Sequence, residues 1–143
     1  CSENFKSYSF FYEWCQEQVG FGNIDSKGIF WHLDKDILVK GNKVYSEDNC
    51  VFIPQRINNL LLKVDKARGK DLLGVFYRED KGKFMCSCSP KGYLGLFNTS
   101  QEAFVAYKNY KEALIKSVAN EYKDRLDQRV YQALINYTVE ITD

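Results

Sequence analysis

The chain has 143 residues, of which 45% are hydrophobic and 15% aromatic, and its formal net charge is +1. This length and composition allow one or two small domains with packed cores. No apolar run reaches the ~18–20 residues that a membrane-spanning helix needs, so we expect no membrane partner. The near-neutral charge does not by itself indicate a nucleic-acid-binding protein.

Charges and cysteines are distributed unevenly along the chain. Lys and Arg outnumber Asp and Glu between Arg56 and Lys83, which favours attraction to nucleic-acid phosphates, whereas acidic residues outnumber basic ones over residues 1–50. The five cysteines lack C-x-x-C spacing and the chain has one histidine, so we expect no zinc site. No signal peptide is visible, which favours a reducing cytoplasm. Because the chain begins with Cys1 rather than Met, we expect the natural protein to have a preceding segment.

The first part of the chain predicts a helix, two short strands and a second helix. Aromatic residues three or four positions apart predict a core-packing helix over Glu3–Gln18. Apolar runs predict strands over Ile29–Leu33 and Cys50–Ile53. Pro54 suits the start of a helix, which we expect over Gln55–Lys63.

After a charged segment that we expect to be a linker (64–71), the pattern changes to strands. Strands are predicted over Leu73–Arg78, Phe84–Ser89 and Tyr93–Phe97, with turns between them. Thr99–Glu102 is a capping box that begins a long helix. The fold class is therefore predicted to be α+β, with a three-stranded antiparallel sheet packed on one helix.

Strand alternation assigns the two faces of this sheet. Phe84, Cys86 and Cys88 are expected to face the helix, while Met85, Ser87 and Ser89 face away from it. Gly95 is expected where the sheet approaches the helix closely. Beyond the long helix we expect another helix around Arg129–Asn136 and a short strand over Thr138–Ile141. The expected domains are residues 1–63 and 72–143.

Three polar residues of the first domain are spaced so that one strand–strand–helix unit would bring them together. Asp34 follows the first strand, Asn49 precedes the second, and Asn58 lies in the helix. Carboxylate and amide oxygens suit Mg²⁺ or a similar divalent cation, which also binds a phosphate oxygen. Asn49 is expected to brace the connecting loop with its side-chain amide.

The stretch that contains these residues resembles the HNH endonuclease family, in the form found in phage and intron homing enzymes. The resemblance is carried by LDKD at 33–36, YSEDNCVF at 45–52 and QRINN at 55–59. It implies a ββα-metal unit that hydrolyses phosphodiester bonds, with Asp34 and Asn58 as metal ligands and Asn49 as the structural Asn.

One position departs from the family pattern. The residue after the metal-binding Asp is often a His that acts as general base, and here it is Lys35, whose ammonium is a poor base at neutral pH. His32, the only histidine, lies on the same strand face as Asp34 by alternation. His32 is therefore either a substitute base or an ordinary strand residue of an inactive nuclease.

The second domain resembles the APETALA/ethylene-response-factor DNA-binding domain, which plant transcription factors and many phage homing endonucleases carry. The matching segments are GVFYR at 74–78, GKF at 82–84, YLGLF at 93–97 and TSQEAFVAY at 99–107. The resemblance implies that the sheet lies in the major groove of double-stranded DNA. It implies these contact residues: Arg78, Lys81, Lys83, Ser87, Ser89, Lys91 and Tyr93. Plant members have Arg where Phe76 and Ser89 stand, which puts tight sequence reading in doubt.

Three functions are compatible with these patterns. The first is a phage-type HNH homing endonuclease, acting with a divalent metal in the cytoplasm of a bacterial host. The second is a catalytically inactive DNA-binding or regulatory protein that uses the same sheet. The third is a protein-interaction module, which the aromatic content and near-neutral charge favour. An unrelated small α+β domain with solvated surface lysines remains the alternative to the sheet resemblance.

Overall fold

The computed structural model describes residues 1–61 and 72–140, so the expected linker at 64–71 lies outside the described residues. The chain forms two compact units that interleave along the sequence. Unit 1 consists of Cys1–Leu62 and Ser117–Asn136, and unit 2 consists of Lys63–Lys116 and Tyr137–Asp143. Within the described residues, no helix is both long enough and apolar enough to cross a membrane.

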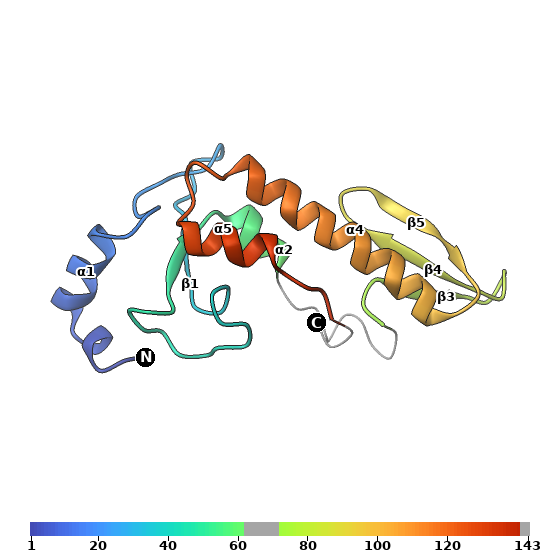
Figure 1. Ribbon diagram of the computed structural model, residues 1–143, viewed down its shortest axis with the longest axis horizontal. Helices are drawn as coiled ribbons and strands as arrows, with labels where there is room; N and C mark the ends of the chain where they lie inside the picture. The colour runs from blue at the N-terminus through green and yellow to red at the C-terminus, as the bar shows by residue number, and fades with distance from the viewer. Residues whose placement is uncertain (62–71, 141–143) are drawn as a thin grey trace. The chain divides into compact units, whose positions relative to one another are not determined.

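Unit 1 begins with a 3₁₀ turn, η1 (Asn4–Lys6), and a helix, α1 (Tyr8–Gln16) (Figure 1). The single helix expected over Glu3–Gln18 is interrupted because Ser7 has an extended backbone and caps α1, its hydroxyl accepting from the Phe10 N–H at 3.4 Å. Not all the aromatic residues pack in the core: Tyr8 is 79% exposed and stacks on Tyr12 at the surface.

The centre of unit 1 is a pair of antiparallel strands, β1 (His32–Asp34) and β2 (Val51–Ile53), in which His32 pairs with Ile53 and Asp34 with Val51. The first strand starts later than expected, because Phe30 forms an isolated bridge with Ile24 instead. Helix α2 (Gln55–Leu60) follows directly and contacts β1, with Ile57 fully buried.

The C-terminal helices complete the core of unit 1. Helix α4 (Ser100–Glu121) runs through both units, and its last turn and α5 (Gln128–Ile135) belong to unit 1. Their buried side chains include Val118, Val130 and Leu134. This differs from the expected division, which placed all of 72–143 in the second domain: burying these apolar side chains in unit 1 removes them from water.

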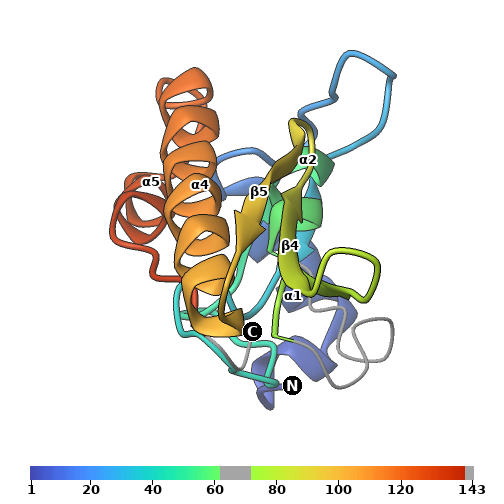
Figure 2. The same cartoon turned by 90° about the vertical axis from the view of Figure 1, so that its right-hand side faces the viewer.

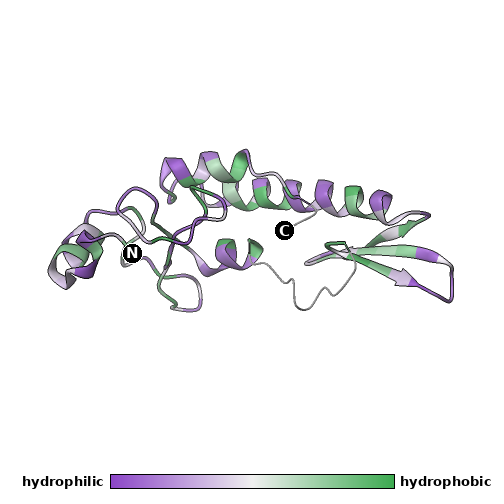
Figure 3. Cartoon of the chain, turned by 90° about the horizontal axis from the view of Figure 1, so that it is seen from below, coloured by the Kyte–Doolittle hydropathy of each residue, from purple (hydrophilic) through white to green (hydrophobic). Residues whose placement is uncertain are grey.

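Unit 2 contains the predicted three-stranded sheet, with strands β3 (Val75–Arg78), β4 (Lys83–Cys88) and β5 (Gly92–Phe97) in the order β3-β4-β5, all antiparallel. The sheet packs on the first part of α4 (Figure 2). The α+β class and the antiparallel sheet packed on a helix are therefore confirmed. Figure 3 shows hydrophobic and hydrophilic residues following one another along α4, as an amphipathic helix requires.

Of Gly74 and Gly95, it is Gly74, immediately before β3, that lies against the helix. A Cβ atom on Gly74 would lie 2.1 Å from the Tyr107 ring of α4, and Gly74 has a φ of +73°, which favours glycine. At Gly95 an added Cβ would meet only the ring of Phe97, at 3.2 Å. The helix-facing assignment of Cys86 and Cys88 is confirmed, since they are 0% and 6% exposed.

The segment after α5 is held in unit 2 by side chains of α4. Lys108 Nζ donates to the Val139 carbonyl at 2.9 Å, and the Val139 N–H donates to Glu112 Oε1 at 2.9 Å. Lys108 and Glu112 are also paired with each other, at 2.5 Å. Residues 137–140 thus form no strand, in contrast to the expectation, and the backbone of Val139 bonds to side chains rather than to a neighbouring strand. Ile141 lies outside the described residues.

Candidate functional site

Asp34 ends β1 and organises the turn that follows it. Its Oδ2 atom accepts the N–H groups of Asp36 at 3.0 Å and Ile37 at 2.8 Å, whereas Oδ1 accepts no backbone hydrogen bond within the described residues. Burial raises the pKa of the Asp34 carboxyl, and the nearby Asp36 charge adds to this increase, while the two N–H groups oppose it. Asp34 Oδ2 is therefore the structural acceptor of this turn, and Oδ1 takes no part in the turn hydrogen bonds.

The two base candidates lie on either side of Asp34. His32 is half-buried on β1, two residues before Asp34 and on the same strand face by alternation. The Lys35 ammonium lies 5.5 Å from the centroid of the Tyr45 ring, in a cation–π contact. This contact holds the Lys35 side chain against an aromatic ring.

The loop between β1 and β2 is braced by Asn42, a residue that the sequence analysis did not single out. Asn42 Nδ2 donates to the carbonyls of Lys35 at 2.7 Å and Val44 at 2.8 Å, and its Oδ1 accepts the Val44 N–H at 3.2 Å. No such side-chain hydrogen bond engages Asn49 within the described residues; only its backbone N–H bonds, to Ser46 at 3.4 Å. The Gly41-Asn42 pair is the sequence signal for this role.

Asn58 lies half-buried on α2, the helix that contacts β1. Its side chain carries an amide oxygen, Asp34 carries a carboxylate, and Asp36 lies close enough to Asp34 for the two carboxyl groups to interact. These hard oxygen donors fit a divalent cation of the Mg²⁺ type, provided that water and phosphate complete its shell. Within residues 1–61 and 72–140 there is no group of three or more His, Cys, Asp or Glu side chains suited to a metal.

The face of the unit 2 sheet that points away from α4 carries both basic and apolar side chains. Direct strand partners place Phe76 beside Met85 and Arg78 beside Lys83, and Ser87 pairs with Tyr93. Phe76 is 48% exposed and Tyr93 58% exposed. The sheet therefore brings together four of the seven expected DNA contacts: Arg78, Lys83, Ser87 and Tyr93.

The other three expected contacts lie in turns rather than on this face. Lys81 lies in the β3–β4 turn, and Ser89 and Lys91 lie in the β4–β5 turn. Ser89 falls outside the sheet because β4 ends at Cys88. All three are exposed at opposite ends of β4, where they can reach phosphates but do not share the face of Ser87.

Arg78 is already engaged by an acidic neighbour. Its Nε and Nη2 atoms donate to the two carboxylate oxygens of Asp80 at 3.0 and 2.9 Å, and Nη1 contacts the Met85 sulfur at 3.8 Å. The Arg78 guanidinium lowers the pKa of the Asp80 carboxyl by this hydrogen bonding. Asp80 thus presents the guanidinium over the sheet in a fixed orientation and competes with any other anion for it.

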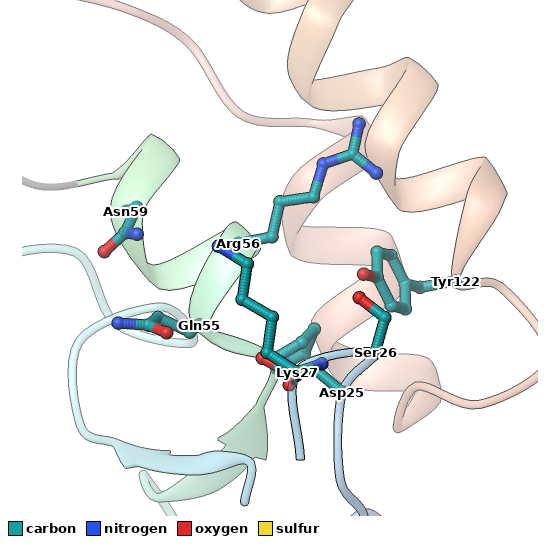
Figure 4. Close-up of a pocket in the computed structure, with 8 residues that line it drawn as sticks. Asp25, Ser26, Lys27, Gln55, Arg56, Asn59 and Tyr122 are labelled. Carbon is teal, nitrogen blue, oxygen red and sulfur yellow. Dashed lines mark hydrogen bonds between the residues drawn. The ribbon is translucent and has the colours of Figure 1, made fainter. Parts of the chain in front are cut away.

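Unit 1 also contains a pocket of about 260 Å³ that the sequence analysis did not predict (Figure 4). It is lined by residues 25–27, residues 54–56, Asn59 and Tyr122. These segments are separated by up to about a hundred positions in the chain, so local sequence patterns could not predict that they line one pocket.

Comparisons of this chain with protein-family models, with curated proteins and with solved structures found no match.

Proposed function

We propose that this protein binds double-stranded DNA through the exposed face of the unit 2 sheet and cleaves it with a metal-dependent site of the HNH type in unit 1. The observation that carries the nuclease proposal is the β1–β2–α2 order, which puts Asp34 at a strand end, with Oδ1 outside the turn hydrogen bonds, and Asn58 on the adjoining helix. That arrangement matches the strand–strand–helix unit expected from the resemblance.

Within this proposal each residue of unit 1 has a distinct role. Asp34 and the Asn58 amide oxygen would hold a divalent cation, which would stabilise the charge that develops on the leaving oxygen. His32 accepts the proton of the attacking water, since an imidazole exchanges protons near neutral pH. The Asn42 hydrogen bonds fix the loop that follows Asp34, in place of the bracing expected from Asn49.

DNA binding by unit 2 is supported by the chemistry of its exposed face. Arg78 and Lys83 are direct neighbours across β3 and β4, and the hydrogen bonding of Arg78 to Asp80 raises the pKa of the guanidinium. Arginine hydrogen-bonds guanine edges in the major groove, whereas lysines mainly bind phosphates. Exposed Phe76 and Tyr93 add apolar surface that base methyl groups can contact.

A second candidate is a DNA-binding protein without catalysis. It is favoured by two observations on unit 1: Asp34 Oδ2 is committed to the backbone of the next turn, and the residue after Asp34 is a lysine held by Tyr45 rather than a free base. In this candidate the β1–β2–α2 unit is a structural remnant and unit 2 alone supplies the function.

A plasmid-nicking assay with Mg²⁺ and with Mn²⁺ tests the proposal. Cleavage is expected for the intact protein and should be lost in Asp34→Asn and Asn58→Ala, with DNA binding retained. Asp34→Asn is preferred to Asp34→Ala because an amide oxygen still accepts the N–H groups of Asp36 and Ile37. Lys43→Gln, on the same loop but outside the site, is the matched control.

Two results would redirect the proposal. If the intact protein binds DNA but never cuts it with any divalent metal, the non-catalytic candidate is correct. If it shows no salt-dependent shift of DNA mobility either, the sheet is a protein-interaction surface and both DNA-based candidates fail.

A further inference from the structure

The pocket of unit 1 has walls that the surrounding structure holds in place. Asp25 Oδ1 accepts the N–H groups of Lys27 at 2.8 Å and Ile29 at 2.9 Å, which fixes the loop on one side. On the other side the Tyr122 ring meets Trp31 edge-on, at 6.2 Å between centroids, and lies 4.6 Å from the Arg125 guanidinium. The pocket is therefore formed before any ligand binds.

The carboxylates around this pocket already have partners. The Asp25 carboxylate accepts backbone N–H groups, and Glu121 Oε2 lies 2.6 Å from Arg56 Nη1 in an exposed ion pair. Lys27, by contrast, has no ion pair within the described residues. Lys27 is thus a cation without a protein counter-ion, and Arg56 keeps donors that Glu121 does not use.

The remaining polar side chains of the pocket are uncommitted. No hydrogen bond within the described residues engages the side chains of Ser26, Gln55 or Asn59. Figure 4 shows the Gln55 and Asn59 amides on one side of the pocket, Ser26 and Tyr122 on the other, and Lys27 extending from the loop toward α2. A pocket of free donors with one free cation matches a ligand that is an anion and rich in acceptors, as phosphate groups are.

From this arrangement we infer that the pocket binds a phosphodiester group of a nucleic-acid backbone. Lys27 neutralises the phosphate charge, the Ser26 hydroxyl and the Gln55 amide donate to its oxygens, and Asn59 reaches the adjoining sugar or base. Asn59 follows Asn58 on α2, so the pocket and the proposed metal site share this helix. This inference rests on the proposed nucleic-acid function, but it concerns residues outside the proposed metal site.

The inference predicts a specific response to the dinucleotide dTpdT, which contains one phosphodiester. In ¹H–¹⁵N spectra of the protein, dTpdT should shift the side-chain amide signals of Gln55 and Asn59 and the backbone signals of Ser26 and Lys27, and these shifts should saturate. Lys27→Gln should weaken this binding at least about fivefold, because it removes the pocket cation that has no protein counter-ion within the described residues. Lys43→Gln, an exposed lysine of unit 1 outside the pocket, should leave the binding unchanged.

Other outcomes overturn the inference. An absence of saturable shifts rules out the site, and equal shifts with sulfate make it a general anion site. Tighter binding of the free nucleotide dTMP than of dTpdT would assign the pocket to mononucleotides instead. The spectra do not depend on cleavage. If the protein binds dTpdT but never nicks DNA, only the nuclease proposal is contradicted. If nicking depends on Asp34 but dTpdT does not bind, only the inference about the pocket is contradicted.

Discussion

Two exposed cations show how differently the two units present charge. In unit 2 the Arg78 guanidinium is held by both oxygens of Asp80, so a DNA ligand must replace a partner that is already in place. In unit 1 Lys27 has no such partner within the described residues, and its neighbours Gln55 and Asn59 are equally uncommitted. In unit 2, therefore, Asp80 orients the Arg78 guanidinium but also competes with DNA for it. In unit 1 the hydrogen-bond donors of the pocket have no such competitor.

The largest expected effect concerns the stability of unit 2. Gly74→Ala should lower the free energy of unfolding by about 2–4 kcal/mol, because the new Cβ would overlap the Tyr107 ring and the backbone φ is positive. Gly82→Ala is the matched control: its φ is also positive, at +61°, but nothing lies within 4 Å, so only about 1–2 kcal/mol should be lost. Urea unfolding measures the loss of stability in each variant. Equal losses would show that the contact between residue 74 and α4 adds nothing to the destabilisation.

The next effect concerns the side chains that hold the last described residues on α4. Glu112→Ala should destabilise the protein by about 1–3 kcal/mol, since the buried Val139 N–H loses its acceptor. Glu112→Gln keeps an acceptor and should cost less. Although burial opposes it, hydrogen bonding from Lys108 and Val139 lowers the pKa of Glu112.

This lowered pKa fixes the direction of a pH effect. The stability from Glu112 is fully present above the unfolded glutamate pKa near ~4.3 and is lost as the pH falls toward the lower folded value. Thermal unfolding of the wild type and of Glu112→Gln across the acidic range checks this. If both respond to acid in the same way, the carboxylate contributes nothing through its charge.

Competition between Asp80 and DNA for the Arg78 guanidinium should have an effect of intermediate size on DNA affinity. Arg78→Ala should weaken duplex binding roughly tenfold and relax the preference at one base pair. Asp80→Asn should strengthen binding a few-fold, because a neutral amide competes less for the guanidinium. Fluorescence anisotropy with a labelled duplex measures both. Weaker binding by Asp80→Asn would mean that Asp80 acts mainly by orienting Arg78.

Lys83 should behave differently from Arg78 if it binds phosphate. Lys83→Ala should weaken all DNA sequences alike and reduce the slope of log affinity against log salt by about 0.9. Measuring affinity for two unrelated duplexes at several salt concentrations separates the roles. Loss confined to one of the two sequences would assign base reading to Lys83.

The smallest expected effect concerns Asp34. Its raised pKa means that folding disfavours the charged carboxylate, so wild-type stability should fall as the pH rises from the unfolded value near ~3.9 to the raised one. Asp34→Asn should remove this pH dependence and change stability at neutral pH by less than about 1 kcal/mol, in the stabilising direction. Asp34→Ala should destabilise, because two turn N–H groups lose their acceptor. Equal stability of the two variants would contradict the turn role.

Residues whose roles follow from local periodicity could be predicted from the sequence. Alternation along β4 assigned Cys86 and Cys88 to the buried face, and the capping box gave the start of α4, where the Glu102 N–H donates to Thr99 Oγ1 at 3.2 Å. These features depend on neighbours within a few positions, where period and capping chemistry decide the structure.

Residues whose roles depend on distant segments could not be predicted in this way. Tyr122 joins the pocket from the end of α4, and no pattern around it indicates the loop at residues 25–27 that it meets. The choice of Asn49 over Asn42 as the loop brace followed a family motif, whereas the hydrogen bonds engage the Asn beside Gly41. Likewise, the side chains of Lys108 and Glu112 bond to the backbone of Val139, where a strand had been expected.

The sharing of α4 between the units has a consequence for how the chain folds as it is synthesised. Unit 1 needs Ser117–Asn136 and unit 2 needs Tyr137–Asp143, so neither unit has all its residues until the segments that follow α4 have been synthesised. At ~5–20 residues per second, the β1–β2–α2 segment waits several seconds before Val118, Val130 and Leu134 arrive to cover its core. During that interval its apolar surface is open to chaperones, and the two units are expected to complete folding almost together.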